Sequence, residues 1–253
     1  MKNKIFTIVA LLITTATAFS QDYSMSLEGI TKVIISSEST IVIKSHDTST
    51  FLIKTSENYR DINSEKSKGL KQISGRGNNN TDYGVEVTKH GTSLIVKGLR
   101  ERRASNLVIH LPENINISVE SLANNEIYID GFSAEIEAIN HHGTTVLSNI
   151  TGPIVAENGN GNISIIFSKL NQSFPMSVIA DNGNIDIKMP SDTSATISAK
   201  TPRGEFYSDF EIELINENTI RKNNRYIKGK INKGGVEVNL QNLKGNIYLR
   251  QLK

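Results

Sequence analysis

Two pairs of carboxylates lie close enough in the sequence to suggest acid–base chemistry. Glu135 and Glu137 would share one face of a strand, and Glu205 and Asp209 lie near one another. Paired carboxylates hydrolyse glycosidic bonds when one donates a proton and the other activates water or attacks the sugar. Such pairs more often decorate the solvent-facing side of a strand. We therefore expect surface residues, and a glycan-active β-helix enzyme is the alternative that these pairs leave open.

Two kinds of segment could hold a metal ion. His141 and His142 are adjacent, and the Asn- and Gly-rich segments 157–162 and 181–186 carry several side-chain oxygens. Adjacent residues on a strand point to opposite faces, however. Segment 181–186 lacks the glycine position and distal glutamate of an EF-hand loop, and neither segment matches the calcium-binding nonapeptide repeat. We expect structural turns and surface histidines, with no metal site and no cofactor.

The sequence gives no support for nucleophilic catalysis or nucleotide binding. It contains no Gly-x-Ser-x-Gly motif and no glycine-rich phosphate loop with Walker spacing. The histidines are scattered, and no serine and acid are placed with any of them in a pattern that suggests a triad: His46, His90, His110, His141 and His142. We therefore expect no catalytic residue and a protein that is not an enzyme.

The charge balance argues against a nucleic-acid partner. The formal net charge of +2 includes Lys2 and Lys4, and without them 26 basic residues face 26 acidic ones. Nucleic-acid-binding proteins normally carry a basic excess. One local basic cluster is interrupted by Glu101, so we expect it to be a solvated loop. Its members are Lys97, Arg100, Arg102 and Arg103.

The first residues predict export. A basic start precedes an apolar run from Ile5 to Ile13, and the small residues Ala18 and Ser20 precede a cut before Gln21. This is the pattern of a secretory signal peptide over residues 1–20. The apolar run has nine residues, whereas a membrane-spanning helix needs about 20. We expect cleavage and no integral membrane span afterwards, and the absence of cysteine leaves neither a disulfide nor a lipid anchored on cysteine.

The following chain is expected to be nearly all β. Short runs rich in Ile and Val alternate with Gly, Asn, Asp and Ser. His90-Gly91 predicts a hairpin turn, because glycine reaches positive φ without steric cost. The polar residues 56–82 are expected to form a mobile loop, and a second interruption runs over 216–225. The early strand candidates are Val33–Ser36, Thr40–Lys44, Phe51–Thr55, Val85–Lys89 and Leu94–Lys97.

From Asn106 onward the sequence repeats one design with a core period of 17 to 19 residues. Each unit opens with an apolar-x-small pattern, continues into a turn with Gly or Asn, and closes with a second apolar strand. The last unit is expected to turn at Gly234-Gly235 and to close with Val236 and Val238. The units start at Val119, Ile136, Ile154, Val178, Ile197 and Ile227.

These short repeats predict a stacked architecture. A unit of this length cannot bury its apolar face unless it stacks on its neighbours. We predict an all-β fold, a single-stranded β-solenoid or β-roll-like stack of short strands. The expected organisation is a signal peptide (1–20), an N-terminal β region that caps one end (21–105), and a β-strand-repeat domain (106–253). At the other end, Lys244, Arg250 and Lys253 would protect an exposed final strand, Ile247–Leu249.

The repeat region resembles the bacterial putative-adhesin family of β-strand-repeat domains over about residues 106–249. The similarity rests on Leu107–Pro112 leading into Asn116–Val119 and on the ordered succession of Asn-Gly turns, with Ala180–Ile187 and Gly204–Phe210 especially similar. The resemblance implies the stacked fold. Because the function of that family is largely undefined, it brings no catalytic residues to this chain.

Outward tyrosines are a further candidate for binding. Tyr128, Tyr207 and Tyr248 occupy regular strand positions and could form an external aromatic ladder. Cross-strand stabilisation accounts for them equally well. The chain has no tryptophan, which weakens a carbohydrate-binding interpretation without excluding it.

These observations favour display as the function. A stiff stack holds outward side chains in rows about 4.8 Å apart, so weak contacts add along its length. We predict a non-enzymatic exported cell-envelope protein, in the periplasm, at the cell surface or secreted, that uses this surface for adhesion or for binding a protein or glycan of the envelope or cell exterior. The alternatives are the glycan-active enzyme and an envelope-stress sensing component.

Overall fold

The computed structural model describes residues 22–54, 69–70, 77–81, 83–99, 106–215 and 226–253. Several predicted segments lie outside these residues: the signal peptide (1–20), most of the loop 56–82, the arginines of the basic cluster and the interruption at 216–225.

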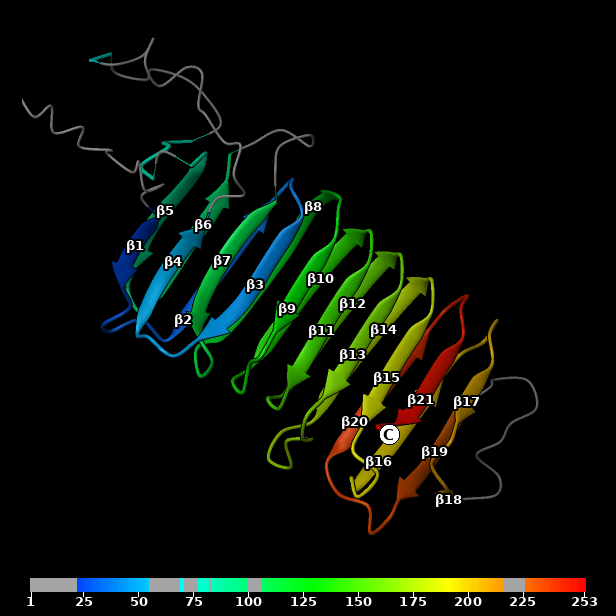
Figure 1. Ribbon diagram of the computed structural model, residues 1–253. Coiled ribbons are helices and arrows are strands. Elements are labelled where there is room, and N and C mark those ends of the chain that lie inside the picture. The colour runs from blue at the N-terminus through cyan, green and yellow to red at the C-terminus, as the bar shows by residue number, and fades with distance from the viewer. Residues whose placement is uncertain (1–21, 55–68, 71–76, 82, 100–105, 216–225) are drawn as a thin grey trace, which may run out of the picture.

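Every regular element in the described part of the chain is a β-strand, which confirms the predicted fold class. Accordingly, no helix there is long and apolar enough to cross a membrane. The strands form two sheets (Figure 1). Sheet A contains, in spatial order, β1 (Tyr23–Ser26), β4 (Thr50–Lys54), β7 (Leu107–Pro112), β3 (Ile41–His46), β9 (Ile127–Asp130), β11 (Thr145–Ile150), β13 (Ile163–Phe167), β15 (Ile185–Met189), β21 (Ile247–Gln251) and β17 (Phe206–Ser208). Sheet B contains β5 (Val85–His90), β6 (Ser93–Gly98), β2 (Lys32–Ser37), β8 (Asn116–Asn124), β10 (Ile136–His142), β12 (Ile154–Asn160), β14 (Met176–Asn182), β20 (Glu237–Asn242), β16 (Ala195–Lys200), β19 (Tyr226–Ile231) and β18 (Ile212–Leu214).

The repeating unit is a rung, defined here as one strand of sheet B followed along the chain by one strand of sheet A. Rung strands run parallel to their neighbours, so each repeat position forms a row across the sheet. Ala138 of β10, for example, is aligned with Val119 of β8 and Ala156 of β12. In spatial order the rungs are β6/β7, β2/β3, β8/β9, β10/β11, β12/β13, β14/β15, β20/β21 and β16/β17.

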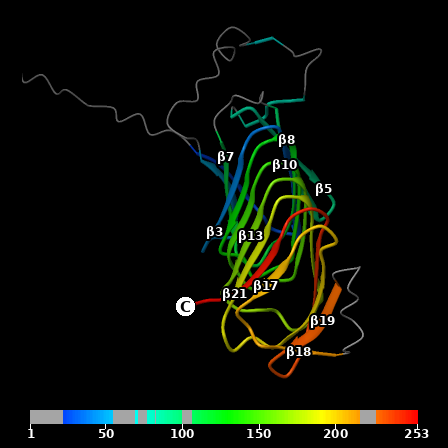
Figure 2. The ribbon, with the colours of Figure 1, turned by 90° about the vertical axis from the view of Figure 1, so that its right-hand side faces the viewer.

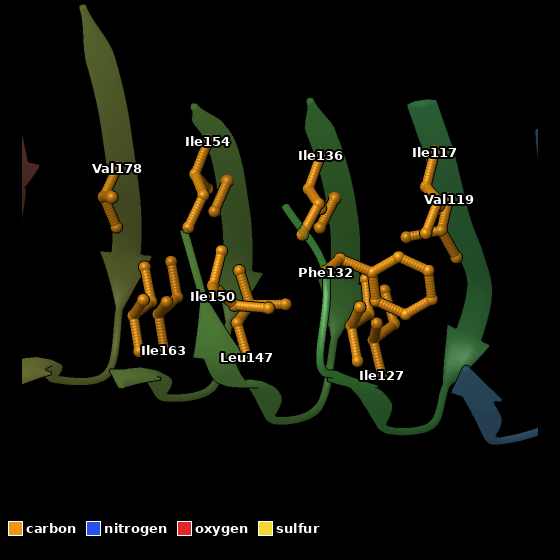
Figure 3. Close-up of a cluster of buried hydrophobic side chains, with 14 of the residues drawn as sticks. Ile117, Val119, Ile127, Phe132, Ile136, Leu147, Ile150, Ile154, Ile163 and Val178 are labelled. Carbon is orange, nitrogen blue, oxygen red and sulfur yellow. The ribbon is translucent and has the colours of Figure 1, made fainter. Parts of the chain in front are cut away.

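The core is a layer of aliphatic side chains between the two sheets. Strand residues alternate between buried and partly exposed positions, as in β10, where Ile136 and Ala138 are fully buried. In Figure 3, Ile136 and Ile154 of sheet B face Ile127 and Leu147 of sheet A. β-branched side chains suit this pleated, one-sided burial, which is why the Ile- and Val-rich runs form the strands.

At the C-terminal end, the order of the rungs in space differs from their order in the chain. Strand β20 pairs with both β14 and β16, and β21 pairs with both β15 and β17. The predicted last unit is therefore wrong, because β19 runs antiparallel to β16 and Gly234-Gly235 leads from β19 into β20. Ile247–Leu249 forms a strand, as predicted, but its predicted place at the exposed end of the stack is wrong, because β21 lies between β15 and β17. Turns rich in Gly serve both kinds of connection, so composition could not distinguish them.

The N-terminal residues cap the other end, as predicted, and also supply an internal rung. Strand β5 runs antiparallel to β6, and the pairing of His90 with Ser93 confirms the predicted hairpin. Strands β4 and β1 extend sheet A in antiparallel order. The five early strand candidates overlap β2 to β6. Rung β2/β3 lies between β6/β7 and β8/β9, so both sheets continue from this region into the repeats.

Candidate binding surface

A row of buried amides holds the Asn-rich turns from inside. Asn140, Asn158 and Asn242 share one inward row at the ends of their strands. The Nδ2 of Asn158 donates to the carbonyl oxygens of Asn162, at 3.2 Å, and of Gly143 on the neighbouring rung, at 2.8 Å. Asn140 and Asn242 bond in the same pattern. Because buried amides need such partners, each one fixes both its own turn and the spacing to the next rung.

The outward oxygens of the same turns also bond between rungs. Asn162 Oδ1 accepts a hydrogen bond from the backbone N–H of Asn184 at 2.8 Å, and Asn184 Oδ1 accepts one from Asn246 at 3.0 Å. The two carboxylates of the segment 181–186 diverge, because Asp181 belongs to sheet B and Asp186 to sheet A. Among the described residues, no group of three His, Asp or Glu side chains could hold a metal ion. The geometry favours turn stacking over calcium binding.

These turns require glycine because neighbouring rungs lie too close together to leave room for a side chain. Gly161 and Gly183 have φ of 136° and 126°, which side chains rarely adopt. A Cβ placed on Gly183 would overlap the carbonyl oxygen of Gly161 on the neighbouring rung. The Asn-Gly signature therefore reports close stacking of turns.

The adjacent histidines contact different neighbours. His141 Nε2 lies 2.9 Å from Glu120 Oε1 on the outer face of sheet B, whereas His142 Nδ1 lies 3.0 Å from Asn160 Nδ2 at the turn edge. Elsewhere, the rings of His46 and His110 lie 6.0 Å apart on sheet A. Burial lowers the pKa of His110, and nearby Lys54 lowers it further. The five histidines do not converge on one site: His46 and His110 lie on sheet A, His141 and His142 at the end of β10, and His90 at the end of β5.

One carboxylate of each predicted pair is engaged in fixed contacts. Glu137 accepts a hydrogen bond from Ser118 Oγ at 2.8 Å and lies 3.3 Å from Lys32 Nζ. The bond from Ser118 lowers the pKa of Glu137, opposed by partial burial and assisted by Lys32. A general acid needs a raised pKa, so this carboxylate is suited to remain an anion. In the second pair, Asp209 Oδ1 accepts from the backbone N–H of Gln251 at 2.7 Å.

Two of the three outward tyrosines form a stack. Tyr207 and Tyr248 are aligned on β17 and β21, with ring centroids 5.3 Å apart and ring planes 10° apart. Tyr207 is 51% exposed. Tyr128 lies in the same row, but β11, β13 and β15 separate it from the pair. The aromatic ladder that the sequence suggested is therefore limited to Tyr207 and Tyr248.

Arg250 contacts both Asp186 and the ring of Tyr248, and so adds a cation to this stack. Its Nε donates to both carboxylate oxygens of Asp186, at 3.1 and 3.2 Å, and its guanidinium carbon lies 5.1 Å from the centroid of the Tyr248 ring. We call Tyr207, Tyr248, Arg250 and Asp186 the tyrosine–arginine patch. The sequence did not reveal the patch as a unit, because its members lie on three strands that only the insertion of β21 brings together.

The chemistry of the patch is that of recognition. Tyrosine and arginine are enriched among the residues that carry most of the energy of protein interfaces. The bonds to Asp186 use Nε of Arg250, which leaves the two terminal guanidinium nitrogens as further donors. Because Asp186 fixes Arg250, a partner would meet these donors already in position.

Two depressions are lined by residues other than those of the patch. One, of about 610 Å³, is lined by the loops after β13 and β15, including Lys169 and Asp192. The other, of about 380 Å³, lies beside β18 and β19, where Glu211, Glu213 and Lys230 line it. Both are lined by mixed polar and apolar residues, and the predicted carboxylate pairs are not among them.

Two solved structures align with most of the chain. A crystal structure of a putative cell adhesion protein from Clostridium sporogenes is 12% identical, with 92% of this chain and 99% of that chain covered and a TM-score of 0.43. One of a putative adhesin from Bacteroides fragilis is 10% identical, with 92% and 96% covered and a TM-score of 0.40. A search of curated proteins finds no match.

The repeat region matches a known family of domains. The match to Toastrack DUF4097 covers residues 116–250, which is more than half of the chain. The resemblance predicted from the ordered Asn-Gly turns is thereby confirmed. The chain belongs to the Toastrack DUF4097 family.

Proposed function

We propose that this protein is a non-enzymatic, exported component of the cell envelope that binds a protein or glycan partner through the outer surface of its stack. The observation that carries the proposal is the tyrosine–arginine patch, where two stacked rings and a fixed guanidinium share the outer face of sheet A. An exposed ring of Tyr207 offers apolar area, and Arg250 offers charge-assisted hydrogen bonds.

The stack suits display because hydrogen bonds join each rung to its neighbours. Buried amides join neighbouring turns, and parallel ladders join neighbouring strands. A surface that does not rearrange loses little conformational entropy when a partner binds. We infer that rigidity of the rungs keeps the patch in a binding-ready arrangement.

Export is part of the proposal and is supported by the pattern of residues 1–20. A basic start, a short apolar run and small residues before Gln21 are typical of a secretory signal. The partner would therefore be met in the periplasm, at the cell surface or outside the cell.

The test is cross-linking of the tagged protein in its native envelope, followed by identification of the captured molecules. The double variant Tyr207→Ala/Arg250→Ala is compared with Tyr128→Ala, which removes an outward tyrosine of the same row that bonds to Glu126. We expect one partner to be captured by the native protein and by Tyr128→Ala and to be lost with the double variant. Capture that is equal for all three proteins would contradict the proposal, as would turnover of envelope polysaccharide by the purified protein.

A further inference from the structure

The four ends of the two sheets are not built alike. At the N-terminal end, sheet A finishes with antiparallel β4 and β1, and sheet B finishes with antiparallel β5. At the C-terminal end, sheet B finishes with antiparallel β19 and β18. Sheet A finishes there with β17, a parallel rung strand that, among the described residues, has no strand on its outer side. In the part of the chain that the structure describes, one sheet end thus lacks the antiparallel strand that closes the other three.

The outer edge of β17 presents a short row of backbone donors and acceptors. Towards β21, the carbonyl of Glu205 accepts from Ile247 N–H and the N–H of Asp209 donates to Leu249. Successive residues of a strand direct their backbone groups to alternate sides. The N–H and C=O groups of Phe206 and Ser208 therefore point away from β21, where an added strand could pair with them.

The opposite end of the molecule shows how this chain closes an edge when no strand follows. On the outer side of β5, the Asn80 side chain accepts from the N–H of Val87 at 2.9 Å and donates to its carbonyl at 2.7 Å. Thr81 Oγ1 donates to the carbonyl of Val85 at 2.8 Å. Side chains thus occupy the edge of β5. In the described residues, no such side-chain bonds to the backbone of Phe206 or Ser208 are present.

A ledge of apolar side chains lies beside the open edge. Sheet B extends two strands, β19 and β18, past the position opposite β17, and Figure 2 shows these strands on the side of sheet B. Ile212 and Leu214 are aligned with buried Ile231 and Gly229 and therefore face the interior. Leu214 nevertheless remains 37% exposed, and Ile212, Ile227 and Phe206 are only partly buried. A strand added beside β17 would cover this ledge.

A second copy of the chain fits this site poorly. Strands β18 and β19 project past β17, so a copy joined through its own β17 would bring its β18 and β19 against those of the first. A single extended segment avoids that conflict, because the same two strands then form its floor.

We propose that β17 is an acceptor edge to which a partner polypeptide adds one antiparallel strand. The inference rests on the proposed function and specifies its partner as a protein segment. Residues opposite Phe206 and Ser208 would exchange backbone hydrogen bonds and point inward over the ledge, so apolar side chains are required there. The residue between them would lie opposite Tyr207, where an aromatic or cationic side chain continues the stack of Tyr248 and Tyr207. The recognised pattern is apolar, aromatic or cationic, apolar.

The probe that tests this pattern is the capped peptide Lys-Thr-Val-Tyr-Val-Thr-Lys, titrated into the full chain and followed by amide hydrogen exchange in NMR. The control peptide carries proline in place of both valines and so lacks the backbone N–H groups that would pair. We expect the valine peptide to protect the amides of Phe206 and Ser208 and the proline peptide to leave them unchanged. Equal effects of the two peptides, or full protection of both amides without peptide, would overturn the inference.

Variants of Ser208 test the edge from the side of the protein. Ser208→Pro removes an N–H that points away from β21, and Ser208→Ala is the matched control because it loses the same hydroxyl contacts with Phe210 but keeps the N–H. We expect Ser208→Pro to weaken binding of the valine peptide about tenfold through the lost bond and the altered edge, with Ser208→Ala close to the native chain. The peptide controls still decide the matter if the proline variant misfolds.

The same variants separate this inference from the proposed function. If capture in the envelope requires the tyrosine–arginine patch but survives Ser208→Pro, strand addition is wrong and the partner binds through side chains, as a glycan would. If neither the substitutions in the patch nor Ser208→Pro changes the capture of the partner, the proposed function itself is wrong.

Discussion

The single N–H of Arg250 Nε donates a bifurcated hydrogen bond to the two carboxylate oxygens of Asp186, at 3.1 and 3.2 Å, although the two residues lie 64 positions apart in the sequence. The contact exists because the C-terminal rung β20/β21 is inserted between β14/β15 and β16/β17. Repeat proteins commonly add their units in order, so that each unit touches its sequence neighbours. Here the last segment of the chain joins two rungs that would otherwise lie apart.

Deletion of residues 237–253 is therefore expected to unfold the C-terminal half of the stack rather than shorten it. The deletion removes four fully buried aliphatic side chains from the interior: Val238, Leu240, Ile247 and Leu249. At about 1.5–3 kcal/mol each, their loss amounts to a large share of the roughly 5–15 kcal/mol that stabilises a typical domain. Thermal unfolding followed by circular dichroism measures the effect, with removal of exposed Lys253 alone as the control. A truncated chain with a native melting transition would show that the inserted rung is dispensable.

Asn158→Ala is expected to destabilise the fold by about 2–4 kcal/mol. The change removes the amide donor to the Gly143 and Asn162 carbonyls, the second of which still accepts from the backbone N–H of Thr145. It also leaves the hydroxyl of fully buried Thr145 without its acceptor. Asn162→Ala is the control, since Asn162 is an outward residue of the same turn. Chemical denaturation of both variants checks the difference, and equal losses would mean that the inward row of amides has no special role.

The fold could be predicted from local patterns, whereas the patch could not. Alternating Ile and Val with Asn-Gly turns identified the rungs from β8 to β15, because each unit carries its own signal. The position of β20/β21 depends on which edge the returning chain joins, and the turns at Gly234-Gly235 and Gly245 have similar compositions. Arg250 contacts Asp186 only because β21 pairs with β15, and no local pattern in the sequence predicts that pairing. The tyrosine–arginine patch therefore has no signature along the sequence. The sequence predicted Tyr207 and Tyr248 as members of a ladder, but it did not predict the contacts of Arg250 with Tyr248 and Asp186.

Gly183→Ala is expected to lower stability more than Gly91→Ala does. Both glycines have positive φ, at 126° and 60°, so both variants incur backbone strain. A Cβ at Gly183 would also overlap the carbonyl of Gly161, while at Gly91 it would meet open space. We expect a further loss of about 1–3 kcal/mol at Gly183, as is usual for overpacking. Similar melting temperatures of the two variants would argue against close contact between the stacked turns.

Stability that depends on Glu137 should decline in acid. The hydrogen bond from Ser118 lowers the pKa of Glu137 below its ordinary value of 4.5, so the folded state favours the ionised carboxylate. Its contribution is present above that ordinary value and is lost as the pH falls through the lowered pKa of the folded state. The effect is expected to be small because the group is partly exposed. An NMR titration checks the direction: Ser118→Ala should raise the pKa of Glu137, and an unchanged value would remove Ser118 as the cause.

The central claim is that a partner binds at the C-terminal end of sheet A, and photo-cross-linking from single positions tests it most directly. A benzophenone amino acid is introduced in place of Tyr207 in one protein and in place of Tyr128 in another, and both are irradiated in the native envelope. The two positions share one row of the same face and differ in their distance from the patch. We expect a discrete cross-linked product from position 207 and none of that product from position 128. Equal products from both positions, or none from position 207, would contradict it.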